Sequence, residues 1–169
     1  MEPTKAVKGR VKTVSVSRTK GVKKTNVLQV RLKENHGIEN DAHAGNWHRQ
    51  VSMLAMESVS KIRAKGLDVH PGDFAENITT EGLELFTLPI GTHLQLGDTV
   101  LVEVTQIGKE CHNRCAIFHA VGDCVMPREG IFVRVLKGGV VRPGDAIVAY
   151  HGKVPPAEAA FDAGQTPCN

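Results

Sequence analysis

Frequent glycine turns are the feature that most restricts the fold of this chain. Seventeen of its 169 residues are glycine, and many stand beside Asp or Pro in pairs typical of tight turns. Between these turns run short segments in which apolar and polar residues alternate, which is the pattern of half-buried β-strands. The sequence therefore predicts a mainly β, barrel-like domain with one substantial helix and few short ones.

Several stretches carry the strand pattern. The clearest is residues 88–108, where the arms THLQL and TVLVEVTQI flank Gly97-Asp98 and predict a β-hairpin. The predicted strands cover residues 7–17, 26–32, the two arms of the hairpin and 128–139, and one more strand ends the stretch 141–150.

One stretch, residues 51–67, has the spacing of an amphipathic helix. Basic residues crowd its last turn, where they suit the negative end of the helix dipole, and Gly66 is a suitable terminating residue. The apolar residues that recur at three-to-four spacing are Val51, Leu54, Ala55, Val59 and Ile62.

The length fits one domain with a hydrophobic core of its own. We expect that domain to cover residues 6–149, and we expect the tail 150–169, which is rich in Pro, Ala and Gly, to be flexible. The first residues lack the apolar stretch of a signal peptide, and no run reaches the roughly 18 apolar residues of a membrane span. These features predict a cytoplasmic protein without a membrane partner.

Positive charge is concentrated at the N-terminal end. Residues 1–24 contain eight Lys or Arg and one acid, Glu2, although the whole chain has a net charge of only +3. A basic end can contact nucleic acid or a membrane, but here the basic residues alternate with Val and Ser, as in a half-buried strand with a solvated edge. We therefore expect no nucleic-acid partner, and an anionic ligand remains a further explanation.

Residues 110–124, ECHNRCAIFHAVGDC, contain three of the four cysteines. A cytosolic chain keeps its thiols reduced, so metal binding or catalysis comes before disulfides. Cys111, Cys115 and Cys124 could bind structural zinc, although their spacing differs from the usual paired motif. They could also be small buried core residues. A third hypothesis is that one cysteine is a reactive thiolate. Cys115 is the favoured candidate because the neighbouring cation of Arg114 would stabilise its thiolate form.

The polar segment 34–50 is long for a loop, and long loops tend to be functional. His43 and His48 lie in it with Asp41, and the two histidines could be metal ligands or proton-transfer groups, or could bind backbone carbonyls. Arg49 could contact a phosphate or form an ordinary salt bridge. Downstream, Asn77 and Thr79 could hydrogen-bond a ligand or stabilise their own turn.

Four separated segments resemble the MOSC domain, the module at the C-terminus of molybdenum cofactor sulfurases. They are GIENDAHAGNWHRQVSML (37–54), PGDFAENITTEGL (71–83), VTQIGKECHNRCAIF (104–118) and MPREGIFVRVLKGGVVRPGD (126–145). Asn40 and Ala75 stand where the family motifs commonly have glycine, and Cys115 aligns with the family's cysteine. The resemblance covers about residues 6–149.

The resemblance implies a β-barrel-like fold and a role with the molybdenum cofactor, molybdopterin. It implies that Cys115 is a molybdenum ligand or a carrier of sulfur, and that the anionic pterin is bound by residues of the matched segments. Molybdenum-dependent reduction of N-hydroxylated compounds is an activity of some relatives. The implied partners are molybdenum cofactor biosynthesis proteins and a cysteine desulfurase or an electron-donor protein. The implied cofactor-binding residues are His43, His48, Arg49, Asn77, Thr79 and Arg114.

Two alternatives to this function stay open at the level of the sequence. One is a non-catalytic module that delivers the cofactor or regulates a molybdoenzyme. The other is a structural domain stabilised by zinc at the three clustered cysteines.

Overall fold

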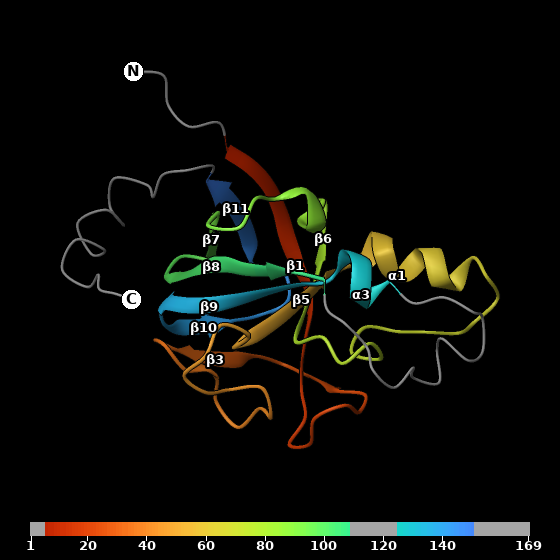
Figure 1. The fold of residues 1–169 in the computed structure, drawn as a ribbon, viewed down its shortest axis with the longest axis horizontal. Coiled ribbons are helices and arrows are strands. Elements are labelled where there is room, and N and C mark those ends of the chain that lie inside the picture. The colour runs from red at the N-terminus through yellow and green to blue at the C-terminus, as the bar shows by residue number, and fades with distance from the viewer. Residues whose placement is uncertain (1–5, 109–124, 151–169) are drawn as a thin grey trace.

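The computed structural model describes residues 6–108 and 125–150 of the chain. Strands are the main regular element of these residues, and helices are few (Figure 1). The strands are β1 (Ala6–Val16), β2 (Thr25–Val27), β3 (Val30–Lys33), β4 (Gly37–Ile38), β5 (Val51–Ala55), β6 (Ile78–Glu81), β7 (His93–Leu96), β8 (Val100–Ile107), β9 (Ile131–Lys137), β10 (Gly139–Val141) and β11 (Ala146–Tyr150). The helices are α1 (Met56–Arg63), the 3₁₀ turn η1 (Leu85–Thr87) and α3 (Met126–Glu129).

Seven of the strands form a closed ring. Their order is β11-β7-β8-β9-β5-β6-β1, and the pairing of β1 with β11 closes it. Every pair in the ring is antiparallel except β5–β6. Strand β2 extends from β1, and a small second sheet has the order β10-β3-β4. The predicted mainly β barrel is therefore confirmed, and closure removes the exposed strand edges that an open sheet would have.

The main core lies inside the barrel and follows from the alternation along the strands. In β7, for example, Leu94 and Leu96 are fully buried, while His93 and Gln95, which alternate with them, are half-exposed. Val, Leu and Ile from the other strands of the ring join them, and the strands of the small sheet add Val30, Leu32 and Val141. In strands such as β7 and β11, one apolar residue in two is sufficient for this core, because only one face of the strand is buried.

A second apolar cluster lies outside the ring under α1 and α3, which Figure 1 shows together at one side of the barrel. It is built around Val59 and Ile62 of α1, Met126 of α3 and Phe132 of β9. Glu129 fastens the two helices together, because its carboxylate accepts hydrogen bonds from Ser58 at 2.5 Å and from Lys61 at 2.7 Å. Helix α3 directly follows the segment 109–124, so this contact fixes the point where that segment ends.

The predicted helix over residues 51–67 is wrong in its first third. Residues Val51–Ala55 form β5, and α1 begins only at Met56. All five residues of β5 are buried, and the strand has hydrogen-bonded neighbours on both sides, β6 and β9. A central strand that is buried on both faces is largely apolar and does not alternate with polar residues. Its apolar residues therefore also fit the three-to-four spacing of an amphipathic helix.

The other predicted strands are found with somewhat different limits. The hairpin at 88–108 is confirmed as β7 and β8 joined at Gly97, whose φ is +65°. Residues 26–32 divide into β2 and β3, with an exposed Leu28 between them. Strand β9 begins at Ile131 because α3 occupies the preceding residues. In the described part of the chain, no helix is long and apolar enough to cross a membrane.

Two positions where glycine is common in the resembling motifs have a left-handed backbone here. Asn40 has a φ of +67° and Ala75 has a φ of +65°. Asparagine tolerates this conformation, but in alanine the Cβ atom crowds the following carbonyl oxygen at a cost of roughly 1–2 kcal/mol. Ala75 is therefore a strained residue, and the strain explains why glycine suits the position.

We predict that Ala75→Gly raises the unfolding free energy by about 0.5–1 kcal/mol, because relief of the strain exceeds the extra chain entropy of glycine. Chemical denaturation checks this. Ala64→Gly is the matched control: Ala64 is exposed with a φ of −64°, so glycine there should destabilise by a similar amount. A loss of stability in both variants would contradict the assignment of strain to Ala75.

Candidate functional site

A buried ion pair shapes the loop that carries the predicted site residues. The Nζ atom of Lys24 lies 2.9 Å from Oδ1 of Asp41, and both side chains have 0% exposure. Lys24 ends the loop between β1 and β2, and Asp41 lies near the start of the loop between β4 and β5. The pair therefore joins two loops that are distant in sequence.

Asp41 also organises the backbone around it. Its Oδ1 accepts a hydrogen bond from the Ser17 N–H at 3.0 Å, and its Oδ2 accepts one from the His43 N–H at 3.0 Å. Burial alone would raise the pKa of the Asp41 carboxyl, but His43, Ser17 and Lys24 outweigh it and hold the pKa far below the ordinary 3.8. Asp41 is thus a carboxylate with its acceptor sites filled by the protein.

Beyond this pair, the loop places Arg49 between two aromatic rings. The Cζ atom of Arg49 lies 4.7 Å from the centroid of Trp47 and 5.4 Å from that of Phe132. Trp47 is itself fixed, since its Nε1 donates to the His43 carbonyl oxygen at 2.8 Å. Lys20 also lies over Trp47, at 5.2 Å. Two cations and two aromatic rings thus gather at this loop.

The guanidinium of Arg49 is not neutralised by the residues that surround it. Its Nε atom is buried and has no hydrogen-bond partner among residues 6–108 and 125–150, and the described carboxylates make no ion pair with it. By contrast, Lys24 is paired with Asp41 and Arg134 with Glu103, each at 2.9 Å. A buried donor without an acceptor costs roughly 1–3 kcal/mol, so an oxyanion at this position would stabilise the protein.

His48 lies next to Arg49 and points a ring nitrogen at strand β8. Its Nε2 is 2.8 Å from Oε1 of Gln106, and its ring meets Trp47 edge-on at 5.8 Å between centroids. The hydroxyl of Thr105 contacts its carbonyl oxygen. The ring is exposed but held from several sides.

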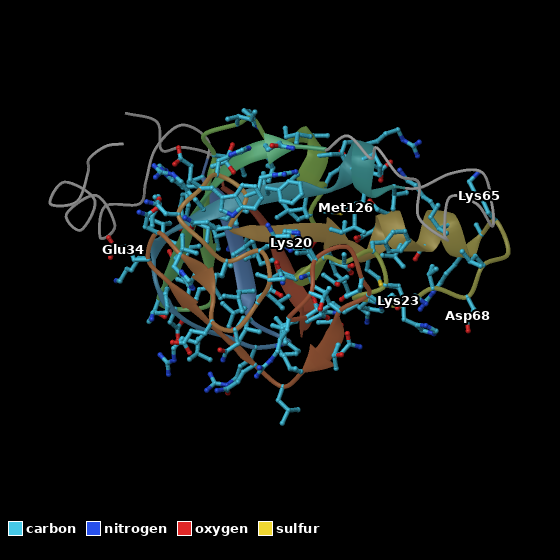
Figure 2. The ribbon with its side chains drawn as sticks, turned by 60° about the horizontal axis from the view of Figure 1, so that its bottom comes forward. Lys20, Lys23, Glu34, Lys65, Asp68 and Met126 are labelled. Atoms are coloured by element: carbon cyan, nitrogen blue, oxygen red, sulfur yellow. The ribbon has the colours of Figure 1, made fainter. Side chains whose placement is uncertain are left out.

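His43 is half-buried, and its Nδ1 lies 3.7 Å from Oδ2 of Asp41. This distance exceeds a hydrogen bond, and Nδ1 has no partner within the described residues. A shallow depression beside it is lined by Arg18, Asn40, Asp41 and Ala42. Arg18 and Lys23 of the β1–β2 loop are exposed, and Figure 2 labels Lys20 and Lys23 on the face that it turns forward.

Asn77 and Thr79 lie elsewhere, in the interior. Both have 0% exposure. Asn77 accepts hydrogen bonds from the N–H and hydroxyl of Ser52 and donates to the Ser15 carbonyl oxygen, while Thr79 donates to Glu76 at 2.6 Å. Buried side chains whose hydrogen-bonding groups are engaged cannot contact a ligand in this arrangement. We therefore assign Asn77 and Thr79 to the support of the fold and leave them out of the ligand surface.

Glu76 is the centre of that support. Its carboxyl group accepts hydrogen bonds from the N–H groups of Gly72 and Phe74 and from the Thr79 hydroxyl. Burial raises the pKa of the Glu76 carboxyl above its ordinary value, against the opposing effect of these hydrogen bonds. Gly72 cannot carry a side chain, because a Cβ atom there would lie 2.5 Å from the Lys24 carbonyl oxygen. Lys24 therefore contacts both matched segments. Its side chain pairs with Asp41 of segment 37–54, and its backbone packs against Gly72 of segment 71–83.

Cys115 and Arg114 lie outside the described residues, as do Cys111 and Cys124. The residues at each end of their segment are placed. Gly108 donates its N–H to the Gly130 carbonyl oxygen at 2.6 Å, and its own carbonyl oxygen accepts from Nε2 of Gln106 at 2.8 Å. Because Gln106 also contacts His48, Gly108, the last described residue before this segment, lies near the His48–Arg49 loop.

Three residues of this surface were missed by sequence reasoning. Lys20, Gln106 and Phe132 belong to distant strands and loops, and nothing in their local sequence marks them. Only the order of the strands in the barrel brings β8 and β9 next to the loop before β5.

A family model for the MOSC domain matches residues 40–148. The chain belongs to the MOSC domain family. This match includes the His48–Arg49 loop, the Glu76 turn and the segment of Cys115. Among curated proteins, the comparison finds no significant match.

Solved structures share the MOSC fold of this chain. The YuaD protein from Bacillus subtilis has a TM-score of 0.71 at 17% identity, over 89% of this chain and 100% of that one. YiiM from Geobacillus stearothermophilus has a TM-score of 0.63 at 22% identity, over 92% and 83%. YiiM from Escherichia coli has a TM-score of 0.59 at 20% identity, over 95% and 80%. At these identities the likeness concerns the fold.

We predict that Asp41→Asn lowers the unfolding free energy by about 3–5 kcal/mol at neutral pH, because it leaves the buried Lys24 cation without its partner. The pKa of Asp41 is lowered on folding, so its contribution is present above the ordinary 3.8 and is lost as the pH falls below that value. The difference between wild type and variant should therefore shrink in acid.

Urea denaturation at several pH values measures this difference. Asp68→Asn is the control, since the Asp68 side chain is 89% exposed, and it should have little effect at any pH. A wild-type advantage over Asp41→Asn that stays constant into acid would contradict the assignment. The pKa of Glu76 is raised on folding, so its effect on the pH dependence of stability has the opposite sign. Glu76 is present in both wild type and variant, so this effect cancels in the difference between their unfolding free energies.

Proposed function

We propose that this MOSC protein binds the molybdenum cofactor at the surface of Trp47, His48 and Arg49, with Cys115 as molybdenum ligand or sulfur acceptor. The observation that carries the proposal is the buried Nε atom of Arg49, which has no protein acceptor within the described residues. Membership of the MOSC family, which is associated with this cofactor, supports it.

The residues present fit an anionic pterin. Arg49 offers a planar fork of donors that matches phosphate, and the two aromatic rings hold the guanidinium in place. The exposed Arg18, Lys20 and Lys23 have no carboxylate partner in the described part of the chain, so positive charge at this surface is unbalanced. Unbalanced cations around a fixed arginine favour a ligand with more than one negative charge.

Cys115 supplies the soft ligand type that molybdenum favours. Its segment starts at Gly108, which connects to His48 through Gln106. An accessible thiolate is equally what a persulfide carrier needs, and Arg114 next to it in sequence would stabilise the charged form. His43 joins the proposal as a half-buried ring of the same loop, whose Nδ1 has no hydrogen-bond partner in the described chain.

The bound cofactor would supply two-electron chemistry at molybdenum, and the chain's own residues would bind and orient it. Reduction of N-hydroxylated compounds is the activity we propose to test, with electrons from an external donor protein. Biosynthesis proteins of the cofactor, or a cysteine desulfurase, would be the partners in loading it. Loaded protein that shows no turnover with any donor would instead be a delivery or regulatory module.

We predict that Arg49→Gln weakens cofactor binding about 10–100-fold, the equivalent of losing charge-assisted hydrogen bonds of roughly 1.5–3 kcal/mol. Molybdenum retained by anaerobic apo-protein after removal of excess cofactor measures it. Arg10→Gln, which removes an exposed arginine paired with Glu81, is the control. Equal retention by Arg49→Gln and wild type would refute this site.

We predict that Cys115→Ala abolishes retention if the thiolate is a ligand, while Cys168→Ala retains molybdenum as wild type does. Retention by Cys115→Ala together with loss of persulfide formation would assign the thiol to sulfur transfer. Absence of retention in wild type would contradict the proposed function, and zinc content would then test the structural alternative.

A further inference from the structure

The hydrogen bond between His48 and Gln106 has a defined direction. Nε2 of Gln106 lies 2.8 Å from the carbonyl oxygen of Gly108, which can only accept. The amide orientation is therefore fixed, and the other amide atom, Oε1, faces Nε2 of His48 at 2.8 Å. Because Oε1 is an acceptor, Nε2 of His48 must carry the proton.

The neutral ring then has its lone pair on Nδ1. Within residues 6–108 and 125–150, Nδ1 of His48 has no hydrogen-bond partner. When the ring gains a second proton, the bond to Gln106 is unchanged, because Nε2–H is the donor in both states. His48 can therefore take up and release a proton at Nδ1 without reorganising its contacts, as a general acid–base group requires.

The fixed position of this ring is unusual for an exposed side chain. Gln106 holds one edge, Trp47 packs against it, and the Thr105 hydroxyl contacts both the His48 carbonyl oxygen and that of Phe132. Ordering an exposed ring costs conformational entropy, which these contacts offset. The ordered ring is next in sequence to Arg49, which has no ion pair among the described residues.

The charged groups on the surrounding elements leave positive charge beside this ring. On the same loop, Asp41 is paired with Lys24, and His43 lies against Asp41. Glu103 of β8 is paired with Arg134 of β9. Arg49 and Lys20, both packed on Trp47, have no such partner in the described chain. Among the described residues, no unpaired carboxylate is found beside His48, so a bound anion would be the counter-ion of the doubly protonated ring.

We propose that His48 takes up a proton at Nδ1 when an oxyanion binds at Arg49, and that Gln106 is the positioning residue that keeps Nδ1 free for it. The proton comes from solvent and stays on the ring as a donor to the bound oxygen. This inference rests on the proposed anion site. It adds that one proton is taken up on binding, which anion binding alone does not require. It would make the site able to deliver a proton to its ligand.

Sulfate is the probe, because it is fully ionised wherever histidine titrates and so contributes no proton of its own. Nitrogen-15 NMR of the histidine rings, with and without sulfate, reports the tautomer and charge of His48. We expect the Nε2–H tautomer in free wild type, a mixture in Gln106→Met, and the Nε2–H tautomer again in Gln106→Glu, which keeps the acceptor. A mixture in free wild type would overturn the role of Gln106.

Sulfate affinity across the histidine titration range tests the proton. In wild type we expect the Kd to rise by up to about tenfold per pH unit on the alkaline side, the limit for uptake of one proton. His48→Gln should bind sulfate without this dependence, and His70→Gln, which removes an exposed histidine paired with Asp68, should behave as wild type. A wild-type Kd that does not change with pH would overturn the proposal while leaving the anion site intact.

Absence of sulfate binding in wild type would overturn both the proton uptake and the anion site. Proton-linked sulfate binding in a protein that retains no molybdenum would uphold the present inference and contradict the cofactor function. The two claims therefore fail separately.

Discussion

The buried pair of Lys24 and Asp41 is the interaction on which the rest of the site depends. It removes two charges from water, which is costly, and is retained because the same carboxylate also accepts from Ser17 and His43. One carboxylate thereby fixes the end of β1, the start of β2 and the loop before β5. The turn at Gly72 packs on the Lys24 backbone, so the Glu76 network joins the same centre.

The contrast between satisfied and unsatisfied polar groups separates the residues that support the fold from the arginine that we propose binds the ligand. Asp41, Glu76, Asn77 and Thr79 are buried with their hydrogen-bonding groups engaged, and they hold the loops in place. Arg49 is the opposite case, since its guanidinium packs on two aromatic rings and its Nε has no acceptor among residues 6–108 and 125–150. A rigid barrel below and a fixed, unpaired cation above are what a preformed anion site requires.

The sequence was sufficient for the class of fold and for the motif segments, because glycine turns and alternation are local properties. It was insufficient at β5, where burial on both faces removed the alternation that marks a strand. It was also insufficient to show that Asn77 and Thr79 support the fold. A polar residue in a motif gives the same sequence pattern whether its side chain contacts a ligand or a buried backbone group. The contacts of Arg49 with Phe132 and of His48 with Gln106 arise from strand order, which no local pattern encodes.

A crystal structure of the protein loaded with molybdenum cofactor would test the central claim most directly. We expect a phosphate oxygen of the cofactor to lie within hydrogen-bond distance of the Arg49 guanidinium, and the aromatic contacts of that side chain to be unchanged. A cofactor bound with its phosphate elsewhere, and Arg49 still without an acceptor, would contradict it.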